Sequence, residues 1–396
     1  MDCTKLQSDI KELEFLRDSL VSNLDYINEN GKDLIKARAS QKQAHAVEDE
    51  LLQNYLQDFA EKNPDLSSWQ LGEEIKGFNS YVRSIATLPD GSTLVGGDNG
   101  ELRVCSRDSS GSWRLSEKIK GFNSYSYITS IATLPDGNAL VGGADGELRT
   151  CSQDPDGNWQ LSEKIKGFDR FNDIRSIATL PDGNALVGGG DGELRVCSRD
   201  TNGNWQLSED ILGFESSIVS IATLSDDSAL VGGLLGELRV CSRYTNGNWK
   251  FSEEIEGFDS GIWSIVPLSD GSTLVGGNYG ELCICSQDPY GNWQLSEEIK
   301  GFNGYITSIA TLPNGSALAG GNFGELRICS QGPDGNWQLS EEIEGFGYPN
   351  VTSIATLPNG NALVGGENGE LRLVSKPPLT IDILKQNLAK LAGEED

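Results

Sequence analysis

The chain has few of the residues from which catalytic and metal sites are usually built. Among its 396 residues there is one histidine and one methionine. The histidine, His45, lies in an N-terminal segment with a helical pattern, and none remains elsewhere for a catalytic triad or for imidazole ligation of a metal. We therefore expect a protein that is not an enzyme and that carries no metal and no cofactor.

Positive charge and long apolar runs are also scarce. Only 31 basic side chains stand against 59 acidic ones, and a net charge of −28 repels phosphate backbones. Nucleic acid is therefore not expected as a partner, whereas a basic protein surface is compatible with this charge. No apolar run approaches the roughly 20 residues of a membrane helix, and no cleavable apolar segment follows Met1. We expect neither membrane insertion nor export by the general secretory route.

The eight cysteines are not spaced as a disulfide framework. Six of them occupy one equivalent position in successive repeats, too far apart to be bridged: Cys105, Cys151, Cys197, Cys241, Cys285 and Cys329. We expect them to be small buried apolar side chains in a reducing, cytoplasmic compartment. Cys283 is irregular because it replaces an arginine of the other repeats, and we expect it to fill the core as well.

What the chain does have is a sequence motif that is repeated seven times. Seven tryptophans recur at intervals of 44 to 46 residues: Trp69, Trp113, Trp159, Trp205, Trp249, Trp293 and Trp337. Seven Ser-Ile pairs keep the same interval, beginning at Ser84, Ser130, Ser176, Ser220, Ser264, Ser308 and Ser353. A period near 45 with strand-like content and no helical periodicity indicates the blades of a β-propeller.

Each repeat contains four short strand candidates separated by turn signals. In the repeat around Trp159 these are "SIATL", "NALVGG", "GELRTCS" and "WQLSEKI", with Pro-Asp-Gly and Asp-Gly-Asn turns between them. We place them in this order from the axis outward and expect the fourth to alternate over its whole length, with Trp159, Leu161, Glu163 and Ile165 on one face. The sequence therefore predicts an all-β fold, a seven-bladed propeller of four-stranded blades.

The two ends of the repeat region predict how the ring closes. The chain enters with a lone fourth strand, residues 69–75, and leaves with a first, second and third strand, residues 353–375. Seven complete blades result only if the first strand pairs with the last three, which also removes exposed strand edges.

Residues 68–375 resemble the WD-repeat family of propellers. The resemblance rests on "GF", "SIATLPDG", "ALVGG" and "GELRVCS" at the places of that family's motifs. Phe78 and its equivalents stand where the family has histidine, and Cys-Ser stands in six repeats where it has Trp-Asp, with Val374-Ser375 in the seventh. The family's polar network between blades therefore cannot form, and we expect packing by Phe, Cys and Trp to replace it.

The segments on either side of the repeats read as helices. Residues 1–63 carry a coiled-coil-like stripe of Leu13, Leu16, Leu20, Leu24 and Ile27. They form either an antiparallel helical hairpin or a coiled coil between chains, which would make the protein a homo-oligomer. Residues 376–396 are expected to hold a short helix and an acidic tail.

Two recurring polar motifs are expected to be structural. The Asp-Pro-Asp-Gly-Asn segments resemble calcium loops, but a tryptophan follows instead of a closing carboxylate, which favours hairpin turns. The glutamate of "GEL" and the arginine of "ELR" recur in nearly every repeat, at Glu101 and Arg103 for example. We interpret them as ion pairs at strand edges or between blades.

Two segments vary between the repeats, and both are expected at one end of every blade, which we call the loop face. One precedes the first strand and the other joins the second strand to the third. They hold aromatic, arginine and leucine residues of the kind found in protein interfaces: Tyr81, Arg83, Tyr125, Tyr127, Arg170, Phe171, Arg175, Leu234, Leu235, Trp263, Tyr279, Tyr305, Phe323 and Tyr348. We expect the "GEL" glutamates to add an acidic fringe.

These patterns favour a non-enzymatic protein–protein interaction scaffold that binds a partner through its loop face. The alternative is a lectin-like or small-ligand propeller with one site per blade, but such a protein should keep the same contact residues in every copy. A second prediction concerns location. Helices, a propeller and a C-terminal "GEED" resemble bacterial effectors that are translocated into a host cell.

Overall fold

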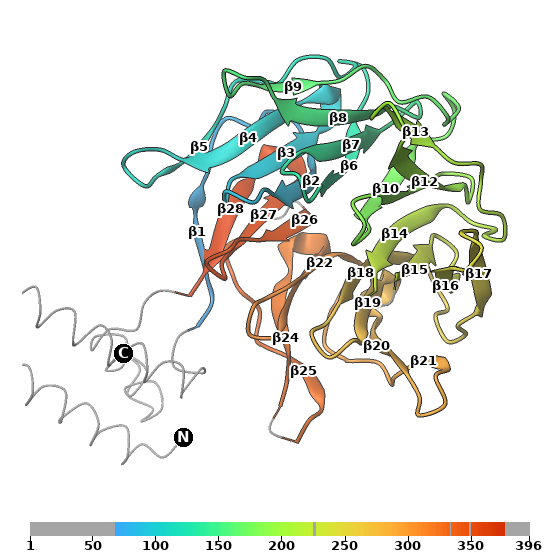
Figure 1. Ribbon diagram of the computed structural model, residues 1–396. Coiled ribbons are helices and arrows are strands. Elements are labelled where there is room, and N and C mark those ends of the chain that lie inside the picture. The colour runs from blue at the N-terminus through green and yellow to red at the C-terminus, as the bar shows by residue number, and fades with distance from the viewer. Residues whose placement is uncertain (1–67, 225–226, 333, 348–349, 377–396) are drawn as a thin grey trace, which may run out of the picture. The chain divides into compact units, whose positions relative to one another are not determined.

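The repeats fold as seven antiparallel sheets arranged in a ring (Figure 1). The structure is a computed structural model that describes residues 68–376 except 225–226, 333 and 348–349. The helices expected within 1–63 and after residue 376 lie outside the described residues, as does Tyr348. The fold class predicted from the repeats is confirmed for the ring.

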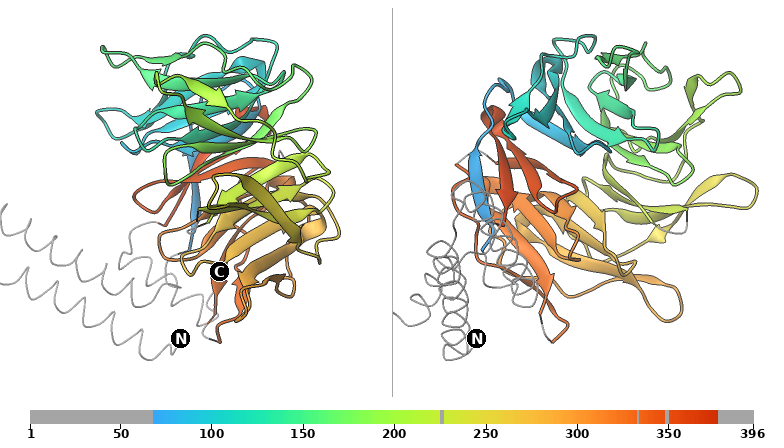
Figure 2. Two further views of the ribbon diagram at one scale, coloured as in Figure 1. Left: turned by 45° about the vertical axis from the view of Figure 1, so that its right-hand side comes forward. Right: turned by 60° about the vertical axis from the view of Figure 1, so that its left-hand side comes forward.

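Each sheet has four strands, and the innermost strands of neighbouring blades pack side by side around the axis (Figure 2). The innermost strands are β2 (Val82–Thr87), β6 (Ile128–Thr133), β10 (Ile174–Thr179), β14 (Ile218–Thr223), β18 (Ile262–Pro267), β22 (Ile306–Thr311) and β26 (Val351–Thr356). The second strands are β3 (Thr93–Gly97), β7 (Ala139–Gly143), β11 (Ala185–Gly189), β15 (Ser228–Gly233), β19 (Thr273–Gly277), β23 (Ala317–Gly321) and β27 (Ala362–Gly366).

The outer half of each blade follows the same plan. The third strands are β4 (Leu102–Arg107), β8 (Leu148–Gln153), β12 (Leu194–Arg199), β16 (Leu238–Arg243), β20 (Leu282–Gln287), β24 (Leu326–Gln331) and β28 (Leu371–Ser375). The outermost strands are β5 (Trp113–Leu115), β9 (Trp159–Leu161), β13 (Trp205–Leu207), β17 (Trp249–Glu254), β21 (Trp293–Leu295), β25 (Trp337–Leu339) and β1 (Gln70–Glu74). We number the blades 1 to 7 from β2–β5 onward, so that blade 7 contains β26, β27, β28 and β1.

Blade 7 closes the ring with strands from both ends of the repeat region. β1 lies beside β28 in its sheet, and the Ile75 amide donates to the carbonyl of Leu371 at 2.7 Å. Arg372 adds a bond from Nη1 to the carbonyl of Gly72 at 3.1 Å. The outer edge of β28 is therefore paired, and the ring is held shut by hydrogen bonds between residues about 300 positions apart in the chain.

The outermost strands are shorter than their alternating pattern predicts. In blade 1, β5 ends at Leu115 because Ser116 interrupts the ladder: its Oγ accepts from the Val104 amide, where a backbone carbonyl would normally accept. Pairing resumes at Ile119, whose amide donates to Leu102. The same interruption in blade 2 leaves Glu163 exposed, so the prediction that it shares a face with Trp159 and Ile165 is wrong.

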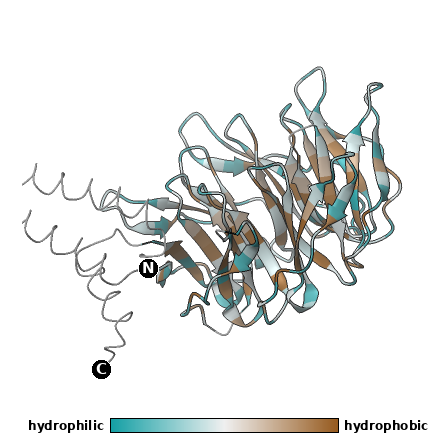
Figure 3. Cartoon of the chain, turned by 90° about the horizontal axis from the view of Figure 1, so that it is seen from below, coloured by the Kyte–Doolittle hydropathy of each residue, from teal (hydrophilic) through white to brown (hydrophobic). Residues whose placement is uncertain are grey.

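The hydrophobic core is divided into clusters that lie between neighbouring blades. One cluster combines Leu94 and Leu102 of blade 1 with Phe122, Ile128 and Cys151 of blade 2, all at most 5% exposed. Another joins blade 1 to blade 7 and so continues the core across the closure. Most hydrophobic residues lie in the strands, whereas hydrophilic residues are frequent in the turns (Figure 3). Packing by Phe and Cys, with Trp partly buried beside them, is therefore confirmed.

Glycine in the second strand lets the blades approach this closely. A Cβ at Gly96 would lie 2.6 Å from Cγ2 of Ile128 in the next blade. The equivalent glycine of every other blade faces the corresponding isoleucine or valine of the next blade. This explains why "VGG" or "AGG" recurs in every copy.

Polar contacts between blades also exist, although the repeat sequences did not predict them. In every blade the serine of the Ser-Ile pair accepts, through Oγ, the isoleucine amide of the next blade, at 2.9–3.0 Å. The last of these seven bonds runs from Ile85 to Ser353 and crosses the closure. The innermost strands have no further strand to pair with on the axial side, so these hydroxyls satisfy amides that would otherwise be buried without a partner.

Candidate functional site

The loop face is built from two segments per blade that hydrogen-bond to each other. In blade 1 the Asp98 amide, at the corner between the second and third strands, donates to the carbonyl of Tyr81, just before the first strand, at 3.2 Å. Blades 2 and 6 repeat this bond from Ala144 to Tyr127 and from Asn322 to Tyr305, both at 3.0 Å. The segments that vary in sequence are therefore adjacent in space and lie at one end of the ring.

The corners adopt a left-handed backbone that suits asparagine and glycine. Four of them are short 3-10 turns: η2 (Asp98–Gly100), η3 (Asn278–Gly280), η4 (Asn322–Gly324) and η5 (Glu367–Gly369). The middle residue has a positive φ, 57° at Asn99 and 63° at Asn368, and a glycine with positive φ follows it. Asn-Gly and Asp-Gly are the usual residues of such turns.

Aromatic residues occupy this left-handed position in two blades. Tyr279 of blade 5 has φ 56° and Phe323 of blade 6 has φ 62°. An ordinary side chain pays roughly 1–2 kcal/mol for this conformation. Burial does not offset that cost, because Tyr279 is 77% and Phe323 56% exposed.

The predicted face residues divide into two groups by blade. Blades 1 to 3 form a charged arc, in which Arg83 pairs with Asp98 and lies over the ring of Tyr127, with Cζ 4.7 Å from the centroid. Tyr127 donates its hydroxyl to Asp173 of the next blade at 2.7 Å. This hydrogen bond raises the pKa of Tyr127, followed in size by the effect of burial. The charged arc is thus a network that crosses three blades.

The remaining predicted residues of the charged arc differ in exposure. Tyr125 and Phe171 are 96% and 80% exposed, and Arg170 is exposed with its Cζ 4.5 Å from the Phe171 ring centroid. Tyr81 is exposed, and Arg175 is half-buried with a buried Nε that has no hydrogen-bond partner.

Blades 4 to 6 form an apolar arc. Leu235 is 78% exposed at its corner, beside the less exposed Leu234. The half-buried Trp263 is held by a hydrogen bond from Nε1 to Oδ1 of Asn278 at 2.6 Å. Tyr279 and Tyr305 pack edge to face across blades 5 and 6, with ring centroids 5.7 Å apart. With Phe323, these side chains give this half of the loop face apolar residues in each of three successive blades.

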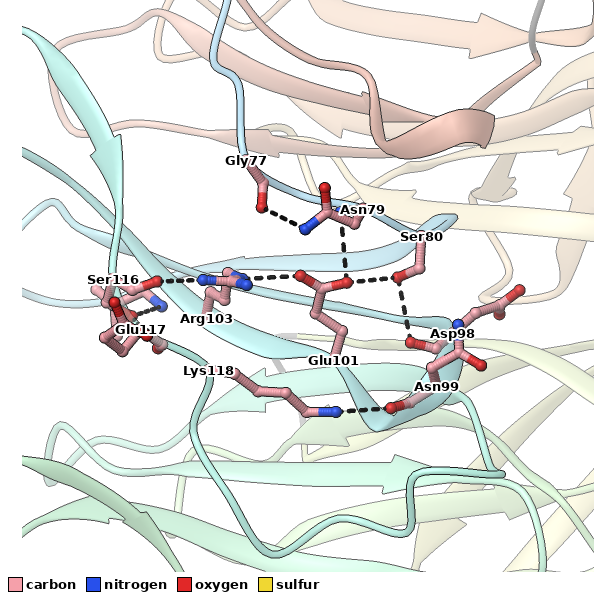
Figure 4. Close-up of polar contacts among 11 residues, drawn as sticks. Gly77, Asn79, Ser80, Asp98, Asn99, Glu101, Arg103, Ser116, Glu117 and Lys118 are labelled. Atoms are coloured by element: carbon pink, nitrogen blue, oxygen red, sulfur yellow. Dashed lines mark hydrogen bonds and ion pairs between the residues drawn. The ribbon is translucent and has the colours of Figure 1, made fainter.

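The "GEL" glutamates are not an acidic fringe, contrary to the sequence-based expectation. Glu101, Glu147, Glu237 and Glu325 are at most 6% exposed. Glu101, Glu237 and Glu325 fold back to bind the loop that leads into their own blade. In blade 1, for example, the carboxylate of Glu101 accepts from the Ser80 hydroxyl at 2.9 Å (Figure 4).

The arginine of the motif completes this arrangement within the same blade. Nε of Arg103 donates to Glu101 at 2.8 Å, and Nη1 donates to the carbonyl of Ser116 at 2.7 Å (Figure 4). The alternative in which this pair links two blades is therefore wrong. It instead joins the corner, the incoming loop and the segment after the outermost strand, and so fixes the shape of the loop face.

The Asp-Gly-Asn segments form hairpin turns at the opposite end of the blades, as predicted. Oδ1 of Asp154 accepts from the amides of Asp156 and Asn158 at 2.9 and 2.8 Å. Because these hydrogen bonds stabilise the charged carboxylate, the pKa of Asp154 is lowered. Its oxygen is thus used by the turn itself.

Equivalent cavities on the loop face differ in chemistry. The cavity of blade 2 has a volume of about 580 Å³ and is lined by three basic side chains, Arg149, Lys164 and Arg170, besides two acidic ones. The corresponding cavity of blade 3, about 390 Å³, is lined by four carboxylates: Asp169, Asp191, Glu193 and Asp210. The blades therefore do not present one repeated ligand site.

The described residues contain no group of three or more histidine, cysteine or carboxylate side chains arranged to hold a metal. Within residues 68–376, outside the gaps named above, no helix is both long and apolar enough to cross a membrane. Seven cysteines are buried and free, and burial raises the pKa of Cys105 and of Cys283 to about 12. Thiolate chemistry is thus suppressed at these positions.

The arrangement of the ring resembles that of a solved propeller. The chain superposes on the WD40 β-propeller domain of Doa1 with a TM-score of 0.64, over 78% of this chain and 98% of that one, at 18% sequence identity. The fold is that of a WD-repeat-like propeller. No protein-family model matches the chain, and no curated protein matches it either. At this identity the WD-repeat likeness extends to the fold alone.

Proposed function

We propose that this WD-repeat-like propeller is a non-enzymatic scaffold that binds a protein partner through the apolar arc of its loop face. The observation that carries the proposal is the pair Tyr279 and Phe323, exposed and held in a left-handed backbone where the corners of blades 1, 2 and 7 have asparagine or aspartate. Such strain typically persists at functional positions.

The surrounding residues have the properties of a binding surface. Trp263 and Tyr305 are anchored by neighbours from the same arc, so they lose little side-chain freedom when a partner covers them. Aromatic residues of this kind dominate interface energetics. The net charge of −28 favours a partner whose contacting surface is basic.

Site-specific photo-crosslinking tests the proposal. A benzophenone amino acid placed at position 279 of the full chain should capture the partner, whereas the same group at position 290 should not. Tyr290 is a matched control because it is 90% exposed and lies at a hairpin tip at the opposite end of the blades. Trp263→Ala and Tyr279→Ala should reduce capture by a label at position 305, and Tyr290→Ala should not. Equal capture from both ends of the ring would refute the proposal.

The alternative, a lectin-like propeller with one site per blade, makes a different prediction. It requires several equivalent sites per chain, and a glycan array together with a measured stoichiometry near seven would replace the scaffold hypothesis. The contrast between the cavities of blades 2 and 3 argues against it.

We further propose, from the "GEED" terminus, that the chain acts in a host cell after translocation. Residues 392–396 lie outside the described part of the chain, so this proposal depends on the sequence alone. Deleting these five residues should abolish translocation in a reporter assay and leave the folded ring unchanged. Undiminished translocation would contradict it.

A further inference from the structure

Six blades bind a guanidinium group at the same place. Two residues after the "GEL" glutamate, an arginine donates from Nε to that carboxylate and from Nη1 to a carbonyl just after or within the outermost strand. The six pairs are Glu101–Arg103, Glu147–Arg149, Glu193–Arg195, Glu237–Arg239, Glu325–Arg327 and Glu370–Arg372. The carbonyl acceptors lie 2.5–3.1 Å from Nη1. In six blades, therefore, the same two acceptors, the "GEL" carboxylate and a carbonyl near the outermost strand, hold the arginine side chain.

Blade 4 shows the arrangement with an additional carboxylate. Arg239 binds Glu237 at 2.7 Å and the carbonyl of Ser252 at 2.9 Å, and its Nη2 lies 3.7 Å from Oε2 of Glu254. Two carboxylates and one carbonyl therefore surround this guanidinium.

Blade 5 keeps the acceptors and lacks the arginine. Glu281, Ser296 and Glu298 occupy the positions of Glu237, Ser252 and Glu254, but Cys283 replaces the arginine. We call Glu281, Ser296 and Glu298 the blade 5 acceptor site.

Among the residues that the structure describes, no basic side chain forms an ion pair with Glu281 or Glu298. Glu281 receives the Ser260 hydroxyl at 2.9 Å. Burial raises the pKa of Glu281, and the charges of Asp259 and Glu298 act in the same direction. Glu281 is also more exposed than the four glutamates that are at most 6% exposed under their arginines.

In blades 2 and 3 the surface at the equivalent position forms a cavity. In blade 2 the cavity of about 580 Å³ is lined by Glu147, Arg149 and Lys164, the counterparts of Glu281, Cys283 and Glu298. Cys283 is shorter than arginine and is 5% exposed within the core cluster beneath Glu281. In blade 5, therefore, no guanidinium of the described chain occupies the place that an arginine fills in six other blades.

We infer that the blade 5 acceptor site binds an arginine side chain of the partner, next to Tyr279 of the apolar arc, which precedes Glu281 by two residues; this inference rests on the proposed function. A guanidinium presents several N–H donors in a planar fork and can bridge separate acceptors. A lysine ammonium is a compact point charge and reproduces this pattern poorly. The recognised segment would thus carry one arginine beside apolar side chains.

Calorimetric titration of the full chain with N-acetyl-arginine amide tests the site directly. The arginine probe should bind with a stoichiometry of one, and the neutral analogue N-acetyl-citrulline amide should not bind. Glu281→Gln should weaken binding by roughly tenfold or more, because a charged hydrogen bond is lost. Absence of binding to the unmodified chain, or equal binding of citrulline, overturns the inference.

Two substitutions at the arginine position sharpen the test. Cys283→Arg supplies the missing side chain within the chain, so it should abolish probe binding and raise the melting temperature, whereas Cys283→Ala should leave probe binding unchanged. Arg327→Cys in blade 6 opens a second site with Glu325 and Glu342, so the stoichiometry should rise from one to two. Unchanged probe binding by Cys283→Arg, with a native melting transition, overturns the inference.

The outcome can be separated from that of the proposed function. If photo-crosslinking of the partner through position 279 persists undiminished in Cys283→Arg, the arginine inference is wrong and the proposed function stands. If no partner is captured at all through the loop face, the proposed function fails, and the titration still decides whether the site accepts a guanidinium.

Discussion

Replacing Tyr279 by asparagine should stabilise the protein although it removes a large aromatic side chain. At φ 56° the backbone of Tyr279 is left-handed, as it is at Asn99, the equivalent corner of blade 1. Asparagine tolerates this region because its short side chain can hydrogen-bond locally, whereas other residues pay roughly 1–2 kcal/mol. The relief is therefore on the order of 1 kcal/mol of unfolding free energy.

A lost aromatic contact reduces this gain at position 279. The edge-to-face contact of Tyr279 with Tyr305 is worth about 0.5 kcal/mol at the low end of the usual range, which fits a ring that is 77% exposed. We expect Tyr279→Asn to gain about 0.5 kcal/mol. Phe323→Asn removes the same backbone cost, from which the loss of the phenylalanine's own contacts is subtracted. In a Tyr305→Ala background the aromatic contact is already gone, so Tyr279→Asn should then gain the full amount.

Reversible urea unfolding, followed by tryptophan fluorescence, measures these differences. Asn99→Tyr should lower stability by about 1 kcal/mol, since it places tyrosine in the same conformation. Leu235→Asn is a matched control, because Leu235 is exposed at its corner without a positive φ and should show no relief. The same Tyr279 and Phe323 variants should weaken partner capture. Loss of stability in both, with Asn99→Tyr neutral, would refute the reasoning.

Three further predictions concern the ring itself. Ser353→Ala leaves the buried amide of Ile85 without its acceptor at the closure and should cost about 1–3 kcal/mol, measured by calorimetry; an unchanged melting temperature would contradict it. Deleting residues 1–66 should leave a stable ring, whereas a deletion that extends through Phe78 removes β1 and should lower the melting temperature sharply; equal melting of the two would count against closure by β1. In a Cys3→Ser variant, none of the seven described thiols should react with a disulfide reagent at pH 8 before unfolding, because each is buried; fast labelling would show that the blades open.

The number of blades and the position of the loop face could be predicted because the seven repeats of the chain can be aligned with one another. Seven copies show which segments are turns and which vary, and strand alternation then places the variable segments at one end. The corner conformation was also readable in principle, since Asn99-Gly100 and Asn368-Gly369 are typical of left-handed turns. Because these corners differ in sequence between the repeats, their shared left-handed conformation, and with it the strain at Tyr279, was not predicted.

The contacts between copies were harder to predict. The Ser-Ile pair was recognised as a marker of the period, but its role depends on the distance between two innermost strands, which no local pattern reveals. The "GEL" glutamates were expected in solvent because glutamate is usually exposed. Glu101 is instead buried because the loop containing Ser80 and the side chain of Arg103 supply the donors that its carboxylate needs.

The pairing of β1 with β28 has a consequence for how the chain is made. Blades 1 to 6 each consist of consecutive strands, so every one of them can form its sheet as it leaves the ribosome. β1 precedes all other strands of the ring and must instead wait unpaired until residues 371–375 have been made, because they form its neighbour. A nascent chain stalled after blade 6 is therefore an open arc with β1 still single, and only the last strands pair with β1 and close the ring.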